Sequence, residues 1–159
     1  MRRSAQIALV TALLLLPGAA QAAGSTIIVS LKNEAITTDL PTGLGMAMGG
    51  DKSKAMMSVI ALPASVPAGE VTFVATNRSS DYVHEMIVAK VVDPAKPLPY
   101  VAADTKVDEE AAGHLGEVSE LDPGKSGKLT LTLEPGTYVL YCNIPGHYMA
   151  GMWATITVR

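Results

Sequence analysis

Apolar and polar residues alternate in several short runs, with the two-residue period of half-buried β-strands. The clearest run is "KLTLTLEPG", in which Leu129, Leu131 and Leu133 alternate with Thr130 and Thr132. Pro/Gly turns such as "DPGKSG" and "EPG" separate the runs. The other β-rich runs are "STIIVSLKN", the two apolar runs of "SVIALPASVPAGEVTFVATN", "YVHEMIVAKVVD", "TYVLYC" and "MWATITVR". This pattern predicts an all-β fold, an antiparallel β-sandwich of Greek-key type.

Two stretches depart from the strand pattern. Residues 39–57, "DLPTGLGMAMGGDKSKAMM", are rich in glycine and methionine and show neither a strand nor a helix period. Residues 94–117 begin with three prolines, and within them "ADTKVDEEAAGH" predicts a short helix that ends before Gly113. No internal repeat and no second domain are evident.

The first 22 residues have the features of a cleaved secretory signal peptide. A basic start is followed by an apolar core over residues 7–16, then Pro17 and Gly18, and the "AQA" pattern that a signal peptidase accepts. The apolar core is too short to span a bilayer comfortably. We therefore predict cleavage after Ala22 and export to the periplasm. The mature chain would be one domain, with an N-terminal strand and Met/Gly-rich loop over residues 23–55 and a core over 56–159.

Charge and cysteine content narrow the possible functions. Removal of residues 1–22 deletes two arginines and no acid, so the net charge changes from −3 to −5. A mildly acidic chain without a basic block argues against nucleic acid as a partner. Cys142 is the only cysteine, so an intramolecular disulfide is impossible. A lone thiol in an oxidising compartment is expected to be buried or bound to something.

The stretch "YCNIPGHYMAGM" places Cys142, His147 and Met152 at equal intervals between two strands. The residues "NIPG" cannot continue a strand, so one stiff loop presents a thiol, an imidazole and a thioether together. A thiolate, imidazoles and a weak thioether form the ligand set of copper that alternates between Cu(I) and Cu(II). Such a site needs a second histidine, and His84 in "DYVHEMIV" is the best candidate because it lies on a strand of the same predicted sheet system.

These motifs resemble the cupredoxins, the small blue-copper proteins that include azurin, rusticyanin and plastocyanin. The C-x4-H-x4-M spacing is similar to that of the azurin and rusticyanin ligand loop, and the likeness extends over most of residues 56–159. The resemblance implies one type 1 copper ion, with His84, Cys142 and His147 as trigonal ligands and Met152 as the weak axial ligand. One departure is Glu85, because azurin-like proteins place Asn or Ser after the first histidine.

Plainer interpretations of the same residues remain open. Cys142 could be an inert buried thiol, His84 a core or surface histidine, and Met152 core filler, with Met149 a rival sulfur. His114 is interpreted as a surface residue in a glycine-flanked loop. The acidic run at 108–110 is interpreted as a solvated face, or as a docking patch for a basic partner.

The methionines of the Met/Gly-rich stretch admit two interpretations. The favoured one is structural: Met46 and Met48 cover the hydrophobic end of the sandwich, and Met56 and Met57 pack in a strand. The other is that their thioethers bind Cu(I), as in copper-trafficking proteins.

The leading functional hypothesis is one-electron transfer by a monomeric protein that binds no substrate. Its partners would be redox proteins such as cytochromes, oxidases or reductases. The alternative is a copper-binding protein for storage, resistance or delivery. Catalysis is not expected, because oxidase-type and nitrite-reductase-type copper centres need more cysteines, histidines or domains than this chain has.

Overall fold

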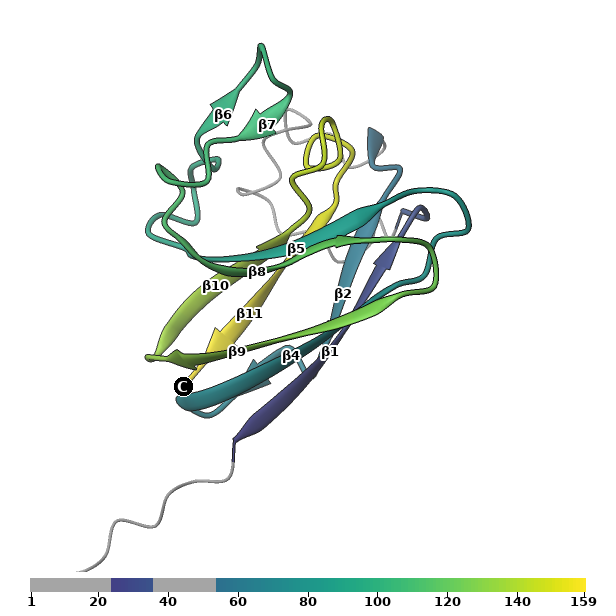
Figure 1. Ribbon diagram of the computed structural model, residues 1–159. Coiled ribbons are helices and arrows are strands. Elements are labelled where there is room, and N and C mark those ends of the chain that lie inside the picture. The colour runs from purple at the N-terminus through teal and green to yellow at the C-terminus, as the bar shows by residue number, and fades with distance from the viewer. Residues whose placement is uncertain (1–23, 36–53) are drawn as a thin grey trace, which may run out of the picture.

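The computed structural model describes residues 24–35 and 54–159, and within them strands form two stacked sheets and one small ribbon (Figure 1). The first sheet has the order β2 (Ser58–Leu62), β1 (Ser25–Lys32), β4 (Gly69–Asn77) and β9 (Ser126–Leu133). The second has the order β3 (Ser65–Val66), β11 (Trp153–Val158), β10 (Gly136–Tyr141), β5 (His84–Lys90) and β8 (His114–Leu121). The ribbon pairs β6 (Tyr100–Val101) with β7 (Lys106–Val107).

The main core lies between the two sheets. Most neighbouring strands are antiparallel, and the pairs β1–β4 and β3–β11 are parallel. Alternate residues of each sheet point inward, which explains the sequence pattern: along β9, Leu129 and Leu131 pack against the core, while the Thr130 hydroxyl contacts the Thr72 hydroxyl at 2.9 Å on the outer face. The predicted all-β sandwich is confirmed.

A long connection between β5 and β8, residues 91–113, forms a second core on the outer face of the second sheet. Leu98, Val107 and Ala112 from this β5–β8 connection pack with Tyr141 and Trp153 of the sheet. In Figure 1 the connection and its β6–β7 ribbon rise beyond the end of the sandwich, beside the yellow loop that follows β10. The outer face of this sheet is therefore shielded from solvent where the connection covers it.

The short helix predicted within residues 103–114 is wrong. Strand β7 occupies part of this segment, and only one turn follows it, in which Asp108 accepts hydrogen bonds from the N–H groups of Ala111 (3.0 Å, to Oδ1) and Ala112 (2.8 Å, to the carbonyl). Gly113 then adopts a φ of 74°, which reverses the chain, and His114 begins β8. One capped turn gives the same sequence signals as the start of a helix.

One prediction about the methionines is wrong, and others concern residues outside the described ranges. Met56 and Met57 do not pack in a strand, because both precede β2, and the Met56 side chain is 65% exposed. The predicted signal peptide and the pair Met46 and Met48 lie outside the described residues. Within the described ranges, no helix has the length and apolar character that crossing a membrane requires.

Candidate metal centre

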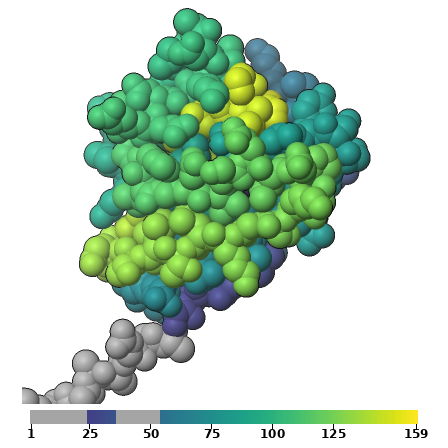
Figure 2. Space-filling view, viewed as in Figure 1, coloured from purple at the N-terminus to yellow at the C-terminus, as the bar shows by residue number. Residues whose placement is uncertain are grey.

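Strand pairing brings the two distant parts of the candidate site together. Strands β5 and β10 are antiparallel neighbours, with Tyr141 opposite Ile87, so Cys142 follows β10 at the level where β5 begins with His84. Both side chains are fully buried. Figure 2 shows the yellow loop after Cys142 at one end of the molecule, between the green β5–β8 connection and teal segments. The site therefore lies at one end of the sandwich, below the surface.

The ligand loop, residues 142–152, is closed by its own hydrogen bonds. The Cys142 N–H donates to the Met152 carbonyl (3.0 Å), and the Met152 N–H donates to the His147 carbonyl (3.1 Å). Gly146 and Gly151 have φ values of 83° and 90°, a left-handed conformation that glycine adopts without steric cost. Little conformational freedom remains to the three candidate ligands of this loop.

Three ligand atoms converge on one point. The His84 Nδ1 and His147 Nδ1 atoms are 3.2 Å apart, and the Cys142 Sγ atom lies 3.9 Å from the first and 3.4 Å from the second. An ion bound trigonally at about 2.0 Å from nitrogen and about 2.3 Å from sulfur would separate such donors by about 3.5–3.7 Å. The residues present therefore fit a small first-row metal ion, and the donors are a thiol and two imidazoles, the set that copper redox sites use.

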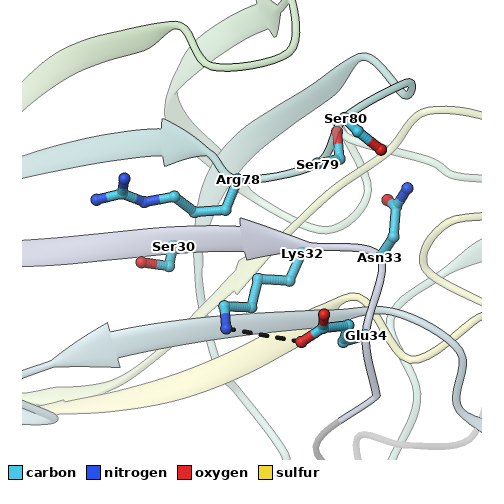
Figure 3. A pocket seen from close by; sticks show the side chains of 7 residues that line it. All are labelled: Ser30, Lys32, Asn33, Glu34, Arg78, Ser79 and Ser80. Atoms are coloured by element: carbon cyan, nitrogen blue, oxygen red, sulfur yellow. Dashed lines mark ion pairs between the residues drawn. The ribbon is translucent and has the colours of Figure 1, made fainter.

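Asn33 determines which nitrogen of His84 is available. Its Oδ1 lies 2.8 Å from His84 Nε2, so Nε2 carries the proton and the Nδ1 lone pair faces Cys142 and His147. The Asn33 amide in turn donates to Asp81 Oδ1 (3.0 Å). Figure 3 shows Asn33 on the wall of a polar surface pocket of about 400 Å³. Solvent thus reaches Asn33, whereas His84 behind it has no exposed surface.

Burial keeps the three donors uncharged in the absence of metal. It lowers the pKa of His84 to about 4, with the neighbouring His147 as a second cause, and it also lowers the pKa of His147. It raises the pKa of the Cys142 thiol to about 12, although N–H groups of Glu85 and Ile144 oppose the shift. The imidazole lone pairs are therefore free at neutral pH, while the thiol needs a cation to become a thiolate.

Glu85 and Asn143 brace the site from the side of the β5–β8 connection. The Glu85 N–H donates to Cys142 Sγ (3.4 Å), and the Glu85 carboxylate accepts from the Asn143 N–H (3.0 Å). The Asn143 side chain exchanges two hydrogen bonds with the Val107 backbone, of 2.7 and 3.0 Å, and also donates to Glu109 Oε1 (2.8 Å). The ligand loop is thereby tied to both β5 and the connection.

The structure separates the remaining sequence candidates. Met152 is fully buried in the same core cluster as Cys142, whereas Met149 is 38% exposed, so Met152 is the sulfur placed inside. His114 belongs to a different group of side chains and is exposed, as predicted. Glu109 is not part of a merely solvated acidic face, because its carboxylate accepts the Asn143 hydrogen bond.

Sequence reasoning missed two residues that shape the site. Asn143 carried a usable signal, because it directly follows the only cysteine and precedes the "IPG" turn. Asn33 carried none, since it lies 51 residues before His84 and meets it only through the packing of β1 against β5.

Comparison with known proteins decides the family. Residues 45–159 match the model of the copper-binding proteins of the plastocyanin/azurin family, which is most of the chain. The chain belongs to this family. Copper is therefore the metal that the donor atoms of this cupredoxin bind. Strand β1, which leads to Asn33, lies outside the matched residues.

Two curated relatives match short segments. Auracyanin-B from Chloroflexus aurantiacus is 54% identical over 39 residues, which are 24% of this chain and 17% of the relative. The copper-resistant cuproprotein CopI from Pseudomonas aeruginosa is 50% identical over 40 residues, which are 24% of this chain and 22% of the relative. The matched segments thus span only about a fifth of each relative's length.

Solved structures agree with the fold. An auracyanin from Roseiflexus castenholzii superposes with a TM-score of 0.52 at 23% identity, covering 85% of this chain and 97% of that one. Rusticyanin from Thiobacillus ferrooxidans superposes with a TM-score of 0.54 at 18% identity, covering 86% and 77%. At these identities the likeness shows the cupredoxin sandwich fold.

Glu85 predicts a pH dependence of stability in the metal-free protein. Burial, followed by the charges of Glu109 and Glu117, raises its pKa from 4.5 to about 7. A carboxyl whose pKa is raised on folding contributes stability that is complete below pH 4.5 and is lost as the pH rises towards 7. Glu85→Gln keeps an oxygen for the Asn143 N–H without the charge. We expect the stability of the variant relative to wild type to increase between pH 5 and pH 8.

Urea unfolding of both metal-free proteins at several pH values measures this difference. Glu110→Gln, an exposed carboxyl in the same connection, is the control and should give a small, nearly constant difference. A Glu85→Gln difference that stays flat across this range would show that folding does not perturb the Glu85 carboxyl.

Proposed function

We propose that this cupredoxin is an exported one-electron carrier, with one copper ion held by His84, Cys142 and His147 and a weak axial contact from Met152. The observation that carries the proposal is the convergence of a thiol and two imidazole nitrogens, all within 3.9 Å of one another, in a buried site. Copper supplies a Cu(I)/Cu(II) couple to such a donor set.

The surroundings suit rapid electron exchange because they hold the donors still. His84 is fixed by β5 and by Asn33, and Cys142 by the end of β10 and the Glu85 N–H. Donors that scarcely move when the charge of the site changes keep the reorganisation energy small. All three donors are at most 7% exposed, which leaves little room for a substrate and supports a carrier rather than an enzyme.

Electrons would enter and leave through His147. It keeps 7% exposure where His84 has none, and the Tyr82 ring contacts it edge-on at a centroid distance of 6.1 Å. Tyr82, Val83 and Met149 are 48%, 36% and 38% exposed and give the surface around His147 an apolar character. Small apolar contacts of this kind form short-lived complexes, as turnover with cytochromes, oxidases or reductases would require.

Export and the monomeric state belong to the same proposal. The signal-like residues 1–22 support a periplasmic protein, and a single buried cysteine that would bind copper suits an oxidising compartment. The domain would then comprise the N-terminal strand and Met/Gly-rich loop (23–55) and the copper-binding core (56–159).

A second candidate function is copper storage, resistance or delivery. The Met56 and Met57 N–H groups both donate to the Ala150 carbonyl, at 2.8 and 3.1 Å, so the end of the methionine-rich stretch lies against the ligand loop. Met56, beside that loop, is 65% exposed, and Met149, within it, is 38% exposed. One matched relative is named a copper-resistant cuproprotein.

The visible and EPR spectra of the protein with one equivalent of Cu(II) test the main proposal. We expect an intense blue thiolate-to-Cu(II) band and a reversible one-electron couple. Cys142→Ser should abolish the band because the thiolate is its source, and His114→Gln should leave it unchanged. A band that survives in Cys142→Ser would overturn the ligand assignment.

Met152→Leu tests the axial contact. The variant should retain copper and its blue band, and its reduction potential should rise, because a weak donor to Cu(II) is lost. Each tenfold loss of preference for Cu(II) over Cu(I) raises a one-electron potential by about 59 mV. Voltammetry measures the shift, with Met149→Leu as the matched control that leaves the potential in place. A fall in potential, or an equal rise in the control, would argue against Met152.

The double variant Met56→Leu/Met149→Leu separates the two candidate functions. A carrier needs neither thioether to hold its copper, so Cu(I) exchange with a soluble chelator should proceed at the wild-type rate. Stopped-flow measurement of that exchange gives the answer. A rate that falls severalfold, while the blue band stays intact, would favour delivery over electron transfer.

A further inference from the structure

A second group of metal-ligating side chains lies outside the copper site. Glu109, His114 and Glu117 each offer one ligand atom, and these atoms all lie within 4.8 Å of one another. The His114 Nε2 and Glu117 Oε2 atoms are 4.0 Å apart. Glu109 and Glu117 are half-buried and His114 is exposed, so the group sits at the edge of the β5–β8 connection, within reach of solvent.

The turn before β8 and the register of β8 bring these three side chains close together. Glu109 lies in the turn before Gly113, whose φ of 74° reverses the chain, and the His114 N–H donates to the Glu109 carbonyl (3.0 Å). Glu117 pairs with Ile87 in the register of β8 and β5, which turns its side chain to the face that the connection covers. The group is therefore formed by two rigid elements, the capped turn and strand β8.

Tyr141 provides an independent observation beside this group. It is fully buried, and its hydroxyl has no hydrogen-bond partner among the described residues. It lies in the same row across the sheet as Ile87 and Glu117, so its side chain is on the face that the connection covers. A buried hydroxyl without a partner costs stability, and a water molecule held on a cation here would give it one.

We propose that Glu109, His114 and Glu117 bind a divalent first-row cation of the Zn²⁺ type at a site separate from the copper site. One imidazole and two carboxylates suit Zn²⁺, whereas Mg²⁺ and Ca²⁺ prefer oxygen alone. Glu109 gives Oε1 to Asn143 and keeps its other oxygen for the cation. The cation would link the connection to β8 and offset the charges of the two carboxylates that bind it.

Calorimetric titration of the copper-loaded protein with ZnCl₂ tests this proposal, with the blue band recorded on the same sample. We expect one Zn²⁺ per chain with the blue band unchanged. His114→Gln and Glu117→Gln should each weaken Zn²⁺ binding by about tenfold or more, since even the loss of an outer partner of a metal ligand costs about 10–100-fold. Glu110→Gln removes the same charge one residue from Glu109 and should leave the affinity unchanged. MgCl₂ should give no comparable binding.

Three results would overturn the site. The first is no Zn²⁺ binding to blue, copper-loaded protein, which would leave His114 and Glu117 as neighbours that share no metal ion. The second is a Glu110→Gln affinity as low as that of His114→Gln, which would indicate general attraction to acidic residues. The third is wild-type Zn²⁺ affinity in both ligand variants. Each leaves the copper proposal standing, because the blue band reports on that site separately.

Discussion

The pairing of β5 with β10 is the contact on which the rest of the site depends. It sets Cys142 beside His84 in a core that water does not enter, and the ligand loop then returns His147 to the same point. Burial favours the neutral forms, so a thiol with a pKa of about 12 can stay in this core without a metal. A cation changes that balance: the thiolate becomes favourable only when the ion arrives, and binding releases the thiol proton.

The donor atoms are held in position by side chains that are not themselves candidate ligands. Asn33 fixes the proton on His84 Nε2 from one side, and Glu85 holds Asn143 from the other. These contacts bridge 51 and 58 residues of sequence, so they act as cross-links between strands rather than as local caps. Because the donors are held from both sides, the geometry is a property of the sandwich and does not need the metal to create it.

Features formed by residues close together in the sequence could be predicted, whereas contacts between distant segments could not. Strand β9 was predictable because only one of its faces is buried, which gives the Leu/Thr alternation, whereas β5 is buried on both faces and contains a continuous apolar run. The ligand loop was predictable because Cys142, His147 and Met152 lie within eleven residues. His84 was predicted from its place on a strand of the same predicted sheet system, and the family resemblance implied the same role. Asn33 escaped notice because its role exists only after β1 packs near β5. The mistaken helix at 103–114 has a different cause, since a capped turn and a helix start share the same first residues.

The departure at Glu85 makes sense once the β5–β8 connection is considered. Burial makes a charged side chain beside the candidate ligand His84 costly, and it raises the pKa of Glu85 to about 7, so the carboxyl is partly neutral near that pH. The hydrogen bond from the Asn143 N–H and the charge of Lys106 in the connection oppose this rise. The Asn143 side chain is in turn bonded to Val107 and Glu109 of that connection. The loop that carries Cys142 is thus braced from outside the sandwich by the β5–β8 connection, through the side chains of Glu85 and Asn143 rather than through a small neutral residue after His84.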